Sequence, residues 1–324
     1  MSLNTSAKST LSKNTKKLMV KVDDELKNIL SNSKTVKQGC LDTLSSGGKK
    51  VRPALTIICG HHQNEQQLIP AAASLELLHS ASLIHDDVLD YSKTRRGKPT
   101  VYAKYGYDYA LKTGDFIFSS AFLTLSRCNN PKLNRILAAS AFKLSLGEIL
   151  QRNTAYNARQ NIDLYYKKIA FKTASLFRAA CLIGAYCADL GEAEVEALGD
   201  YGHNLGLAFQ VFDDILDFIG DERTMGKAVA SDIRDGMMTL PIFLALDELS
   251  EKSVLVNAVQ NRDNSDEEIL EAVVLVKQTK AIKKSRSQAK DYIGKAIASL
   301  NILKTGNIKD ELTRLANLVI ERNM

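Results

Sequence analysis

The sequence predicts an all-α protein. Apolar residues recur every three or four positions through long segments of the 324-residue chain, which is the period of one helix face. Runs that alternate between apolar and polar residues, as half-buried strands do, are scarce. Only 5 residues are Pro, and none of the breaks between the helical segments resembles a long flexible linker. We therefore expect a single helical domain over residues 21–324.

Local signals place three of the helices. Residues 71–92 form one periodic segment, and Pro70 suits its first turn because that position needs no backbone N–H. Residues 192–219 form another, which Gly220 would end. The Ser-Asp-Glu-Glu run that opens residues 265–275 matches a capping box, a reciprocal pair of hydrogen bonds found at helix starts.

The first 20 residues differ from the rest of the chain. They are rich in Ser, Thr, Lys and Asn, and residues 1–22 hold five lysines and no acidic residue. Such a composition predicts a mobile basic segment. An organelle transit peptide is the alternative, and the absence of Arg counts against it. Without these lysines the formal charge falls from +6 to about +1, so the basic balance gives no reason to expect a nucleic-acid partner.

Neither a membrane span nor secretion is predicted. No apolar run reaches the roughly 18 residues that a membrane-spanning helix needs. The N-terminus also lacks the apolar core of a secretory signal. The 5 Cys residues are odd in number, show no C-x-x-C spacing and lie in mostly apolar sequence. We expect buried free thiols and a cytoplasmic location, where thiols stay reduced.

An Asp-Asp-x-x-Asp pattern occurs twice, at residues 86–90 and 213–217, each time inside an apolar helical segment. At about 100° per residue, the first and last Asp of each pattern lie about 40° apart around the helix and share a face. A single acidic turn is usually a solvated helix face, but two copies in apolar surroundings argue against that explanation. The candidate metal ligands are Asp86, Asp87, Asp90, Asp213, Asp214 and Asp217.

These carboxylates need a cation if the two helices present them to one cavity. Like charges within a few ångströms raise one another's pKa and oppose ionisation. Oxygen-only ligands suit a hard ion, so magnesium is favoured over zinc. Magnesium held by a few carboxylates usually completes its shell with phosphate oxygens and water. The motifs therefore predict a magnesium site that binds a phosphate or diphosphate.

Basic residues could complete such a site. Lys49 and Arg52 lie in the run Gly-Gly-Lys-Lys-Val-Arg-Pro, where the glycines would let backbone approach an anion. A plain helix-start turn explains this run equally well. Arg95 and Arg96 follow the first Asp motif within six residues and could either pair with its carboxylates or clamp a diphosphate. Taken singly, four further candidates are uninformative: His79, Lys172, Thr173 and Lys227.

Taken in order, these elements resemble the trans-isoprenyl diphosphate synthases, also called polyprenyl synthetases. The order is Gly-Gly-Lys-x-x-Arg-Pro, His-x6-Asp-Asp-x-x-Asp, Arg-Arg-Gly-Lys, Lys-Thr, Phe-Gln-x-x-Asp-Asp-x-x-Asp, Gly-Lys and Thr-Leu-Pro. The resemblance covers about residues 47–241 and extends more weakly to the C-terminus. Several elements in one order make it specific.

The resemblance implies a bundle of roughly a dozen helices around a central cavity, usually a homodimer. It implies a prenyltransferase with about three magnesium ions that joins isopentenyl diphosphate to an allylic diphosphate primer. The main magnesium ligands would be Asp86, Asp90 and Asp213, with Asp87 and Asp217 supporting them. The isopentenyl diphosphate would contact Lys49, Arg52, His79 and Arg96. The allylic diphosphate would contact Arg95, Lys172, Gln210 and Lys227, while Thr173 would sit near the developing cation. Catalytic candidates are thus Lys172, Thr173 and Gln210.

Two positions depart from the family pattern. Met237 stands where many relatives have a Lys that contacts the allylic diphosphate, and its loss could weaken binding. Ala230 stands where Gly is common.

In the family that the chain resembles, bulky residues five and four positions before the first Asp motif stop the growing tail early. Here these positions hold the small residues Ala81 and Ser82, which leave the path of a growing tail open. We therefore expect a medium or long polyprenyl product rather than farnesyl diphosphate. A short-chain product such as farnesyl or geranylgeranyl diphosphate is the alternative, if bulky residues close the cavity lower down. The candidates for such a floor are Phe116, Phe118 and Phe122.

Three other functions compete. A class I terpene cyclase also uses an Asp-rich helix and magnesium, but it needs no second diphosphate site, so the basic cluster argues against it. A subunit of a heteromeric prenyltransferase, catalytic or not, is a second alternative that Met237 keeps open. A helical scaffold without catalytic activity is the third alternative, and it predicts no ligand binding that depends on magnesium.

Overall fold

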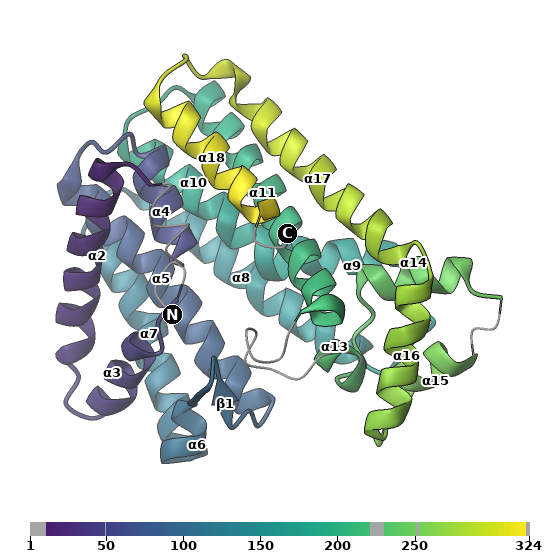
Figure 1. Cartoon of the computed structure of the whole chain (residues 1–324). Coiled ribbons are helices and arrows are strands. Elements are labelled where there is room, and N and C mark those ends of the chain that lie inside the picture. Colours follow the sequence, from purple (N-terminus) through teal and green to yellow (C-terminus); the bar gives the residue numbers. More distant parts are fainter. Residues whose placement is uncertain (1–10, 49, 221–229, 251–252, 322–324) are drawn as a thin grey trace. The chain divides into compact units, whose positions relative to one another are not determined.

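The computed structural model describes residues 11–48, 50–220, 230–250 and 253–321, and these are almost wholly helical (Figure 1). The only strands among them are the two-residue β1 (Thr94–Arg95) and β2 (Lys98–Pro99), which pair antiparallel. The predicted all-α class is therefore confirmed.

The chain forms two compact units, and each unit combines three separate stretches of sequence. The first holds residues 1–141, 176–202 and 299–315; the second holds residues 142–175, 203–298 and 316–324. Each contact described below lies inside one unit. The single domain over residues 21–324 remains a prediction.

The first unit is built around the 25-residue helix α5. Helices α2, α4 and α7 pack on α5 (Figure 1). The elements that lie wholly in this unit, apart from the strands, are α2 (Lys13–Ser31), α3 (Lys37–Ser45), α4 (Val51–Cys59), α5 (Glu65–Leu89), α6 (Val101–Tyr105), α7 (Tyr107–Ser126) and η2 (Leu300–Ile302).

The second unit contains the shorter helices between positions 162 and 298. The elements that lie wholly in it are α9 (Ile162–Ile169), the π-helical turn η1 (Ala170–Ala174), α13 (Ser231–Arg234), α14 (Leu240–Glu248), α15 (Ser253–Gln260) and α16 (Asp266–Gln278). Five described helices belong partly to each unit: α8 (Pro131–Thr154), α10 (Ser175–Cys187), α11 (Glu192–Ile219), α17 (Ala281–Ser299) and α18 (Asn307–Glu321).

Helix α5 begins earlier and ends sooner than predicted. It starts at Glu65, so Pro70 lies inside the helix instead of in its first turn. It ends at Leu89, and Asp90 is its C-cap, with the Asp90 N–H donating to the Asp86 carbonyl at 2.8 Å. The last Asp of the motif therefore stands just beyond the regular helix.

The predicted mobile segment over residues 1–20 is too long at its C-terminal end. Helix α2 begins at Lys13, because Ser12 caps it by accepting a hydrogen bond from the Thr15 N–H. Leu18 and Met19 are buried and hold its first turns against the unit. Residues 1–10 lie outside the described part of the chain.

The other two predicted helices are confirmed. Helix α11 runs from Glu192 to Ile219, and Gly220 follows it as expected. Helix α16 opens at Ser265 with the predicted capping box, in which Ser265 and Glu268 exchange hydrogen bonds, and it continues three residues further than expected, to Gln278.

Burial also bears on the thiols and on membrane insertion. All 5 cysteines are free and buried, as predicted. Among the described residues one helical stretch, Ile162–Cys187, is long and apolar enough to cross a membrane by composition. However, 67% of its most apolar window is buried inside the protein, which is typical of a core helix.

Candidate functional site

The first Asp motif lies where α5 reaches the surface of the first unit. Asp90 is exposed and Asp86 half-buried, whereas Asp87 is buried. The Arg95 Nε donates to the Asp87 carboxylate at 2.7 Å. Burial raises the pKa of Asp87, and Arg95 opposes that rise. The sequence left open whether the following arginines pair with the motif or clamp a diphosphate. Arg95 does pair with the motif, at Asp87.

A group of cationic side chains surrounds His79, seven residues before the motif on the same helix. The pKa of His79 lies well below its usual value, because the ring is buried and because Arg52, Arg96 and Arg95 all oppose its protonation. The guanidinium of Arg52 also stacks on the ring of Phe177, with 4.8 Å between its central carbon and the ring centroid. A neutral imidazole among three guanidinium groups is a setting that favours an anion.

Glu76 is a member of this cluster that the sequence analysis missed. Its pKa is raised by burial and lowered by Arg52, Lys50 and Arg96. Glu76 lies one turn before His79 on α5. Glu76 is a single acidic residue in an apolar run, and this could have marked it as a site residue. Burial of a carboxylate without a partner is unfavourable, so such an acid is expected to have one.

The loop before α4 is held by Arg96. The Arg96 guanidinium donates to the Gly47 carbonyl. A Cβ at Gly48 would lie 3.1 Å from the Arg96 Nη1, so this Gly allows a close approach between loop and guanidinium. Gly47 itself has a positive φ of 70°, which favours glycine. The neighbouring Lys49 falls outside the described residues.

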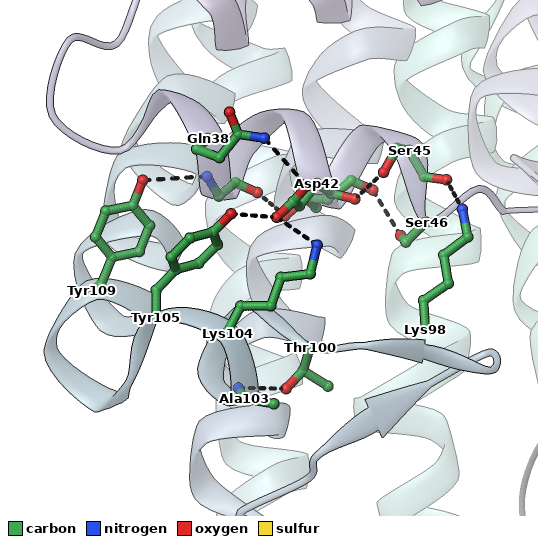
Figure 2. A network of polar contacts seen from close by, with 12 residues as sticks. Gln38, Asp42, Ser45, Ser46, Lys98, Thr100, Ala103, Lys104, Tyr105 and Tyr109 are labelled. Atoms are coloured by element: carbon green, nitrogen blue, oxygen red, sulfur yellow. Dashed lines mark hydrogen bonds and ion pairs between the residues drawn. The ribbon is translucent and has the colours of Figure 1, made fainter.

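A second set of contacts fixes the C-terminal half of α3, which leads into this loop (Figure 2). The Asp42 carboxylate accepts hydrogen bonds from Lys104 Nζ at 3.0 Å and from the Tyr105 hydroxyl at 2.8 Å. These bonds lower the pKa of Asp42, although partial burial works against them. Lys98 Nζ donates to the Ser45 carbonyl at 2.6 Å, at the last turn of α3. Helix α6 and the strand before it therefore position the loop.

One cleft of the first unit collects these groups. Its polar wall includes Glu76, His79 and Arg96, and its apolar wall includes Leu26 and Leu77. Asp42, Gly47, Lys50, Asp87 and Arg95 line it as well. The two predicted chain-length residues lie on α5 close to it. Ala81 is fully buried, and Ser82 is half-buried with its hydroxyl donating to the His79 carbonyl at 2.8 Å.

The second Asp motif distributes its carboxylates differently. Asp213 is exposed, while Asp217 is 0% exposed. Asp217 accepts hydrogen bonds from the Ser231 hydroxyl at 2.9 Å and from the Asp232 N–H at 3.0 Å. Helical periodicity places Asp213 and Asp217 on one face, but packing against the start of α13 buries the second of them.

Asp214 is bonded through both carboxylate oxygens. The Tyr165 hydroxyl donates to one oxygen at 2.6 Å, and the Gln210 amide nitrogen donates to the other at 3.0 Å. Burial raises the pKa of Asp214 to about 6, assisted by Asp213 and Asp217, while the two hydrogen bonds lower it. The Gln210 amide oxygen in turn accepts from the Thr173 hydroxyl at 2.7 Å, so two predicted catalytic residues are in direct contact.

Lys172 and Thr173 lie in η1, the π-helical turn between α9 and α10. Such turns widen a helix locally and occur often at functional sites. Gly147 of α8 packs against this turn, and a Cβ there would lie 2.7 Å from the Lys172 backbone nitrogen. Lys172 forms an ion pair with Glu148 at 2.5 Å, and Glu148 also pairs with Arg152 at 2.8 Å.

The carboxylates present fit a magnesium ion better than a closed metal site. Among the described residues no group of three or more His, Cys, Asp or Glu side chains is arranged to hold an ion. Within the first unit the more exposed carboxylates of the motif are Asp86 and Asp90, and within the second unit the exposed one is Asp213. Magnesium tolerates so few protein ligands because it keeps water and phosphate oxygens in its shell. A structural zinc site would need four N or S ligands.

The chain matches a known protein family. The family model for polyprenyl synthetase matches residues 33–276, which contain both Asp motifs and the basic cluster. The chain belongs to the polyprenyl synthetase family. As a family member it is a trans-prenyltransferase, and the resemblance inferred from its motifs is confirmed.

Relatives of this polyprenyl synthetase differ in the product that their names state. Component 2 of the heptaprenyl diphosphate synthase of Bacillus subtilis is 35% identical over 284 residues, covering 87% of this chain and 81% of the relative. A short chain isoprenyl diphosphate synthase of Methanocaldococcus jannaschii is 37% identical over 270 residues, 81% and 82% of the two chains.

Solved structures show the same fold. The heptaprenyl diphosphate synthase of Staphylococcus aureus has a TM-score of 0.91 at 30% identity, covering 97% of this chain and 100% of the other. A polyprenyl synthase of Caulobacter crescentus CB15, complexed with calcium and isoprenyl diphosphate, has a TM-score of 0.90 at 31% identity, covering 95% and 96%.

Ala230, one of the two departures from the family pattern, now has a structural consequence. It is the N-cap of α13 and is buried in a left-handed conformation, with φ at 59°. Glycine adopts this conformation without steric cost, whereas a Cβ is strained there. Met237, the other departure, is half-buried, and its N–H donates to the Asp232 carbonyl at 2.7 Å. Lys227 lies outside the described residues.

We predict that Ala230→Gly stabilises the protein by about 1 kcal/mol, because the strain of a left-handed Ala exceeds the extra chain entropy that Gly loses on folding. Urea unfolding monitored by circular dichroism measures the change. A loss of stability would contradict the strained geometry at Ala230.

We also predict that Gly147→Ala destabilises the protein by roughly 1–3 kcal/mol, because the added methyl group would force α8 away from the Lys172 turn. Gly294→Ala on α17 is the matched control. A Cβ at Gly294 meets nothing within 4 Å, so that change should be neutral or stabilising by up to about 1 kcal/mol. Equal effects of the two substitutions in thermal unfolding would contradict the close approach at Gly147.

Proposed function

We propose that this polyprenyl synthetase is a magnesium-dependent enzyme that condenses isopentenyl diphosphate with an allylic diphosphate into an all-trans polyprenyl diphosphate longer than farnesyl diphosphate. The observation that carries the proposal is the cleft of the first unit, which His79, Arg95 and Arg96 line together, and His79 lies on the helix that ends in the first Asp motif. A site for an anion and a site for a divalent cation thus share one helix.

The basic cluster is proposed to bind the diphosphate of isopentenyl diphosphate. Arg52 and Arg96 would supply charge-assisted hydrogen bonds. His79 stays neutral beside them, so it can donate one hydrogen bond without adding charge. Lys49 belongs to this proposed set as well.

The carboxylates are proposed to hold magnesium on the allylic diphosphate. Asp86, Asp90 and Asp213 are the proposed main ligands, with Asp87 and Asp217 supporting them. The family resemblance implies about three ions, which neutralise the charge that grows on the leaving diphosphate. Arg95, Lys172 and Lys227 would contact the same group.

Ionisation of the allylic carbon–oxygen bond leaves a cation that water would capture, so the site must be dry. Thr173 is 7% exposed, and its hydroxyl donates a hydrogen bond to the amide oxygen of the half-buried Gln210. We propose that the two dipoles face the developing cation. The double bond of isopentenyl diphosphate then attacks, and a proton leaves the new carbon chain. The released diphosphate is the proposed proton acceptor.

The small side chains one turn before the Asp motif support a product longer than farnesyl diphosphate. Ala81 is buried and Ser82 bonds back to its own helix, so neither blocks a tail that descends along α5. Phe118 and Phe122 of α7, with ring centroids 5.2 Å apart, are candidates for a lower floor, as is Phe116. Short-chain synthesis is the second candidate, and the name of the Methanocaldococcus jannaschii relative favours it.

Assembly has two candidates. We propose a homodimer, for which α8 offers the exposed side chains of Phe142 (69%) and Ile149 (53%) on one face. A partnership with a second, different subunit is favoured by the Bacillus subtilis and Geobacillus stearothermophilus relatives, since both are named component 2. Turnover by the purified chain alone would exclude an obligatory partner.

We further propose a cytoplasmic location, consistent with the five free thiols.

The proposed function is tested by incubating the purified chain with magnesium, isopentenyl diphosphate and separate primers of different length. Isopentenyl diphosphate should be consumed and a polyprenyl diphosphate of more than three isoprene units should form. Omission of magnesium is the control. Consumption of the primer alone with release of a hydrocarbon would indicate a terpene cyclase instead.

We predict that Asp86→Ala lowers turnover by at least about a hundredfold, because it removes a charge that holds magnesium on the leaving group. Circular dichroism should be unchanged. Asp108→Ala, which removes an exposed carboxylate from the first turn of α7, is the control. Near-normal turnover of Asp86→Ala would refute the metal role.

We predict that Ser82→Phe or Ala81→Phe shortens the product, because an added ring would block the path of the tail below Asp86. Ala81→Leu should shorten it less, in line with its smaller volume. Chromatography of the dephosphorylated products measures the chain length. An unchanged distribution in all three variants would rule out a floor at this turn.

We predict that Asp42→Asn raises the KM for isopentenyl diphosphate about tenfold and leaves the KM for the primer within about twofold. The substitution removes the charge that anchors Lys104 and Tyr105 to α3, and a contact weakened by about 1.4 kcal/mol corresponds to a factor of ten. Glu192→Gln, which breaks the surface pair with Lys132, should change neither value. A parallel rise in both KM values would contradict a local effect on the loop.

A further inference from the structure

Four side chains of the second unit form one continuous chain of hydrogen bonds. Tyr165 donates to Asp214 at 2.6 Å, Gln210 donates to the same carboxylate at 3.0 Å, and Thr173 donates to Gln210 at 2.7 Å. They come from α9, α11 and η1. The chain joins a fully buried tyrosine to the residue proposed to lie beside the allylic cation.

The carboxylate at position 214 determines which way the Gln210 amide points. A carboxylate can only accept hydrogen bonds, so the group that faces it must be the amide nitrogen. The amide oxygen is then directed at Thr173. The reversed amide would place two oxygen atoms against each other at about hydrogen-bond distance, which is repulsive in a buried site.

This orientation also fixes the role of the Thr173 hydroxyl. A hydroxyl group can donate one hydrogen bond, and the Thr173 hydroxyl donates it to the Gln210 amide oxygen. Toward any further group the oxygen can therefore act only as an acceptor. An oxygen lone pair stabilises a neighbouring positive charge, whereas a hydroxyl proton would repel it.

Tyr165 holds the carboxylate in place from the other side. Its hydroxyl is bonded to Asp214, and its ring packs near the ring of Phe243, with 6.2 Å between the centroids. Tyr165 is 2% exposed and Asp214 is 3% exposed, so water cannot readily replace either partner. With both carboxylate oxygens accepting hydrogen bonds from side chains, Asp214 is committed to this chain.

We propose that Asp214 and Tyr165 are positioning residues that orient the Gln210 amide and thereby present Thr173 as an acceptor to the allylic cation, so that Asp214 is not a magnesium ligand. The inference rests on the proposed function of the same site. Asp214, one of the six metal-ligand candidates of the sequence analysis, is thereby assigned a role in orienting Gln210 instead.

The test compares Tyr165→Phe and Asp214→Asn with the wild-type chain in steady-state assays over a range of magnesium concentrations. The introduced amide of Asp214→Asn can accept only through its oxygen, so it cannot satisfy both donors, and it allows the Gln210 amide to reverse. We expect its kcat to fall about a hundredfold. Tyr165→Phe keeps the ring and should lower kcat about threefold to tenfold. The magnesium concentration for half-maximal activity should stay within about twofold of wild type in both.

Tyr201→Phe is the matched control. Tyr201 is also fully buried, and its hydroxyl donates to a backbone carbonyl, that of Leu312, at 2.7 Å. This substitution should lower the melting temperature about as much as Tyr165→Phe and leave kcat unchanged. A purely structural role for Tyr165 would make the two variants alike in both measurements.

A double-mutant cycle then asks whether Asp214 acts through Gln210. If it does, Asp214→Asn should cost little in a chain that already carries Gln210→Leu, so the two losses should be far from additive. Additive losses would overturn the proposal. So would a tenfold or larger rise in the half-maximal magnesium concentration for Asp214→Asn, which would identify a metal ligand.

If Asp214→Asn does not fold, Tyr165→Phe decides the matter, and an unchanged kcat in that variant overturns the proposal. The proposed function fails separately: it is refuted if the wild-type chain consumes no isopentenyl diphosphate. An active wild type whose kcat is matched by both variants refutes only the positioning role.

Discussion

Electrostatic repulsion within two acidic helix turns is the constraint on which the site depends. Each motif places three carboxylates within one and a half helical turns, and each also contains a buried carboxylate that accepts hydrogen bonds from other side chains. Asp87 is bonded to Arg95, and Asp214 to Tyr165 and Gln210. Asp217 is buried as well and accepts from Ser231, so the more exposed Asp86, Asp90 and Asp213 are the residues proposed to hold magnesium.

The same principle organises the cationic cleft. Arg52, Arg95 and Arg96 keep His79 neutral, and Glu76 offsets part of their mutual repulsion. Arg96 holds the loop before α4 from the following segment of chain, and Lys98 and the Asp42 group hold α3, which leads into that loop. The proposed anion site is therefore built from residues that lie up to about 60 positions apart and that only folding brings together.

Sequence patterns predicted the parts of the site that depend on local spacing. Periodicity gave α5 and α11, the capping box gave α16, and the order of the motifs gave the family. Spacing did not predict which carboxylates of a motif are exposed, because burial decides that. Asp213 and Asp217 share a helix face, yet one is exposed and the other fully buried, because the start of α13 covers Asp217. Pattern alone could not show this, since the covering residues follow fourteen and fifteen positions later in the chain.

By itself the sequence determined that the chain is all-α, that it carries two Asp motifs with basic partners, and that it is a polyprenyl synthetase. Only the tertiary structure decided which carboxylate is paired, which way the Gln210 amide points and why position 230 suits glycine. The reason is physical. Helix formation and motif order are local properties of the chain, whereas the protonation and direction of a polar group depend on the neighbours that packing places around it.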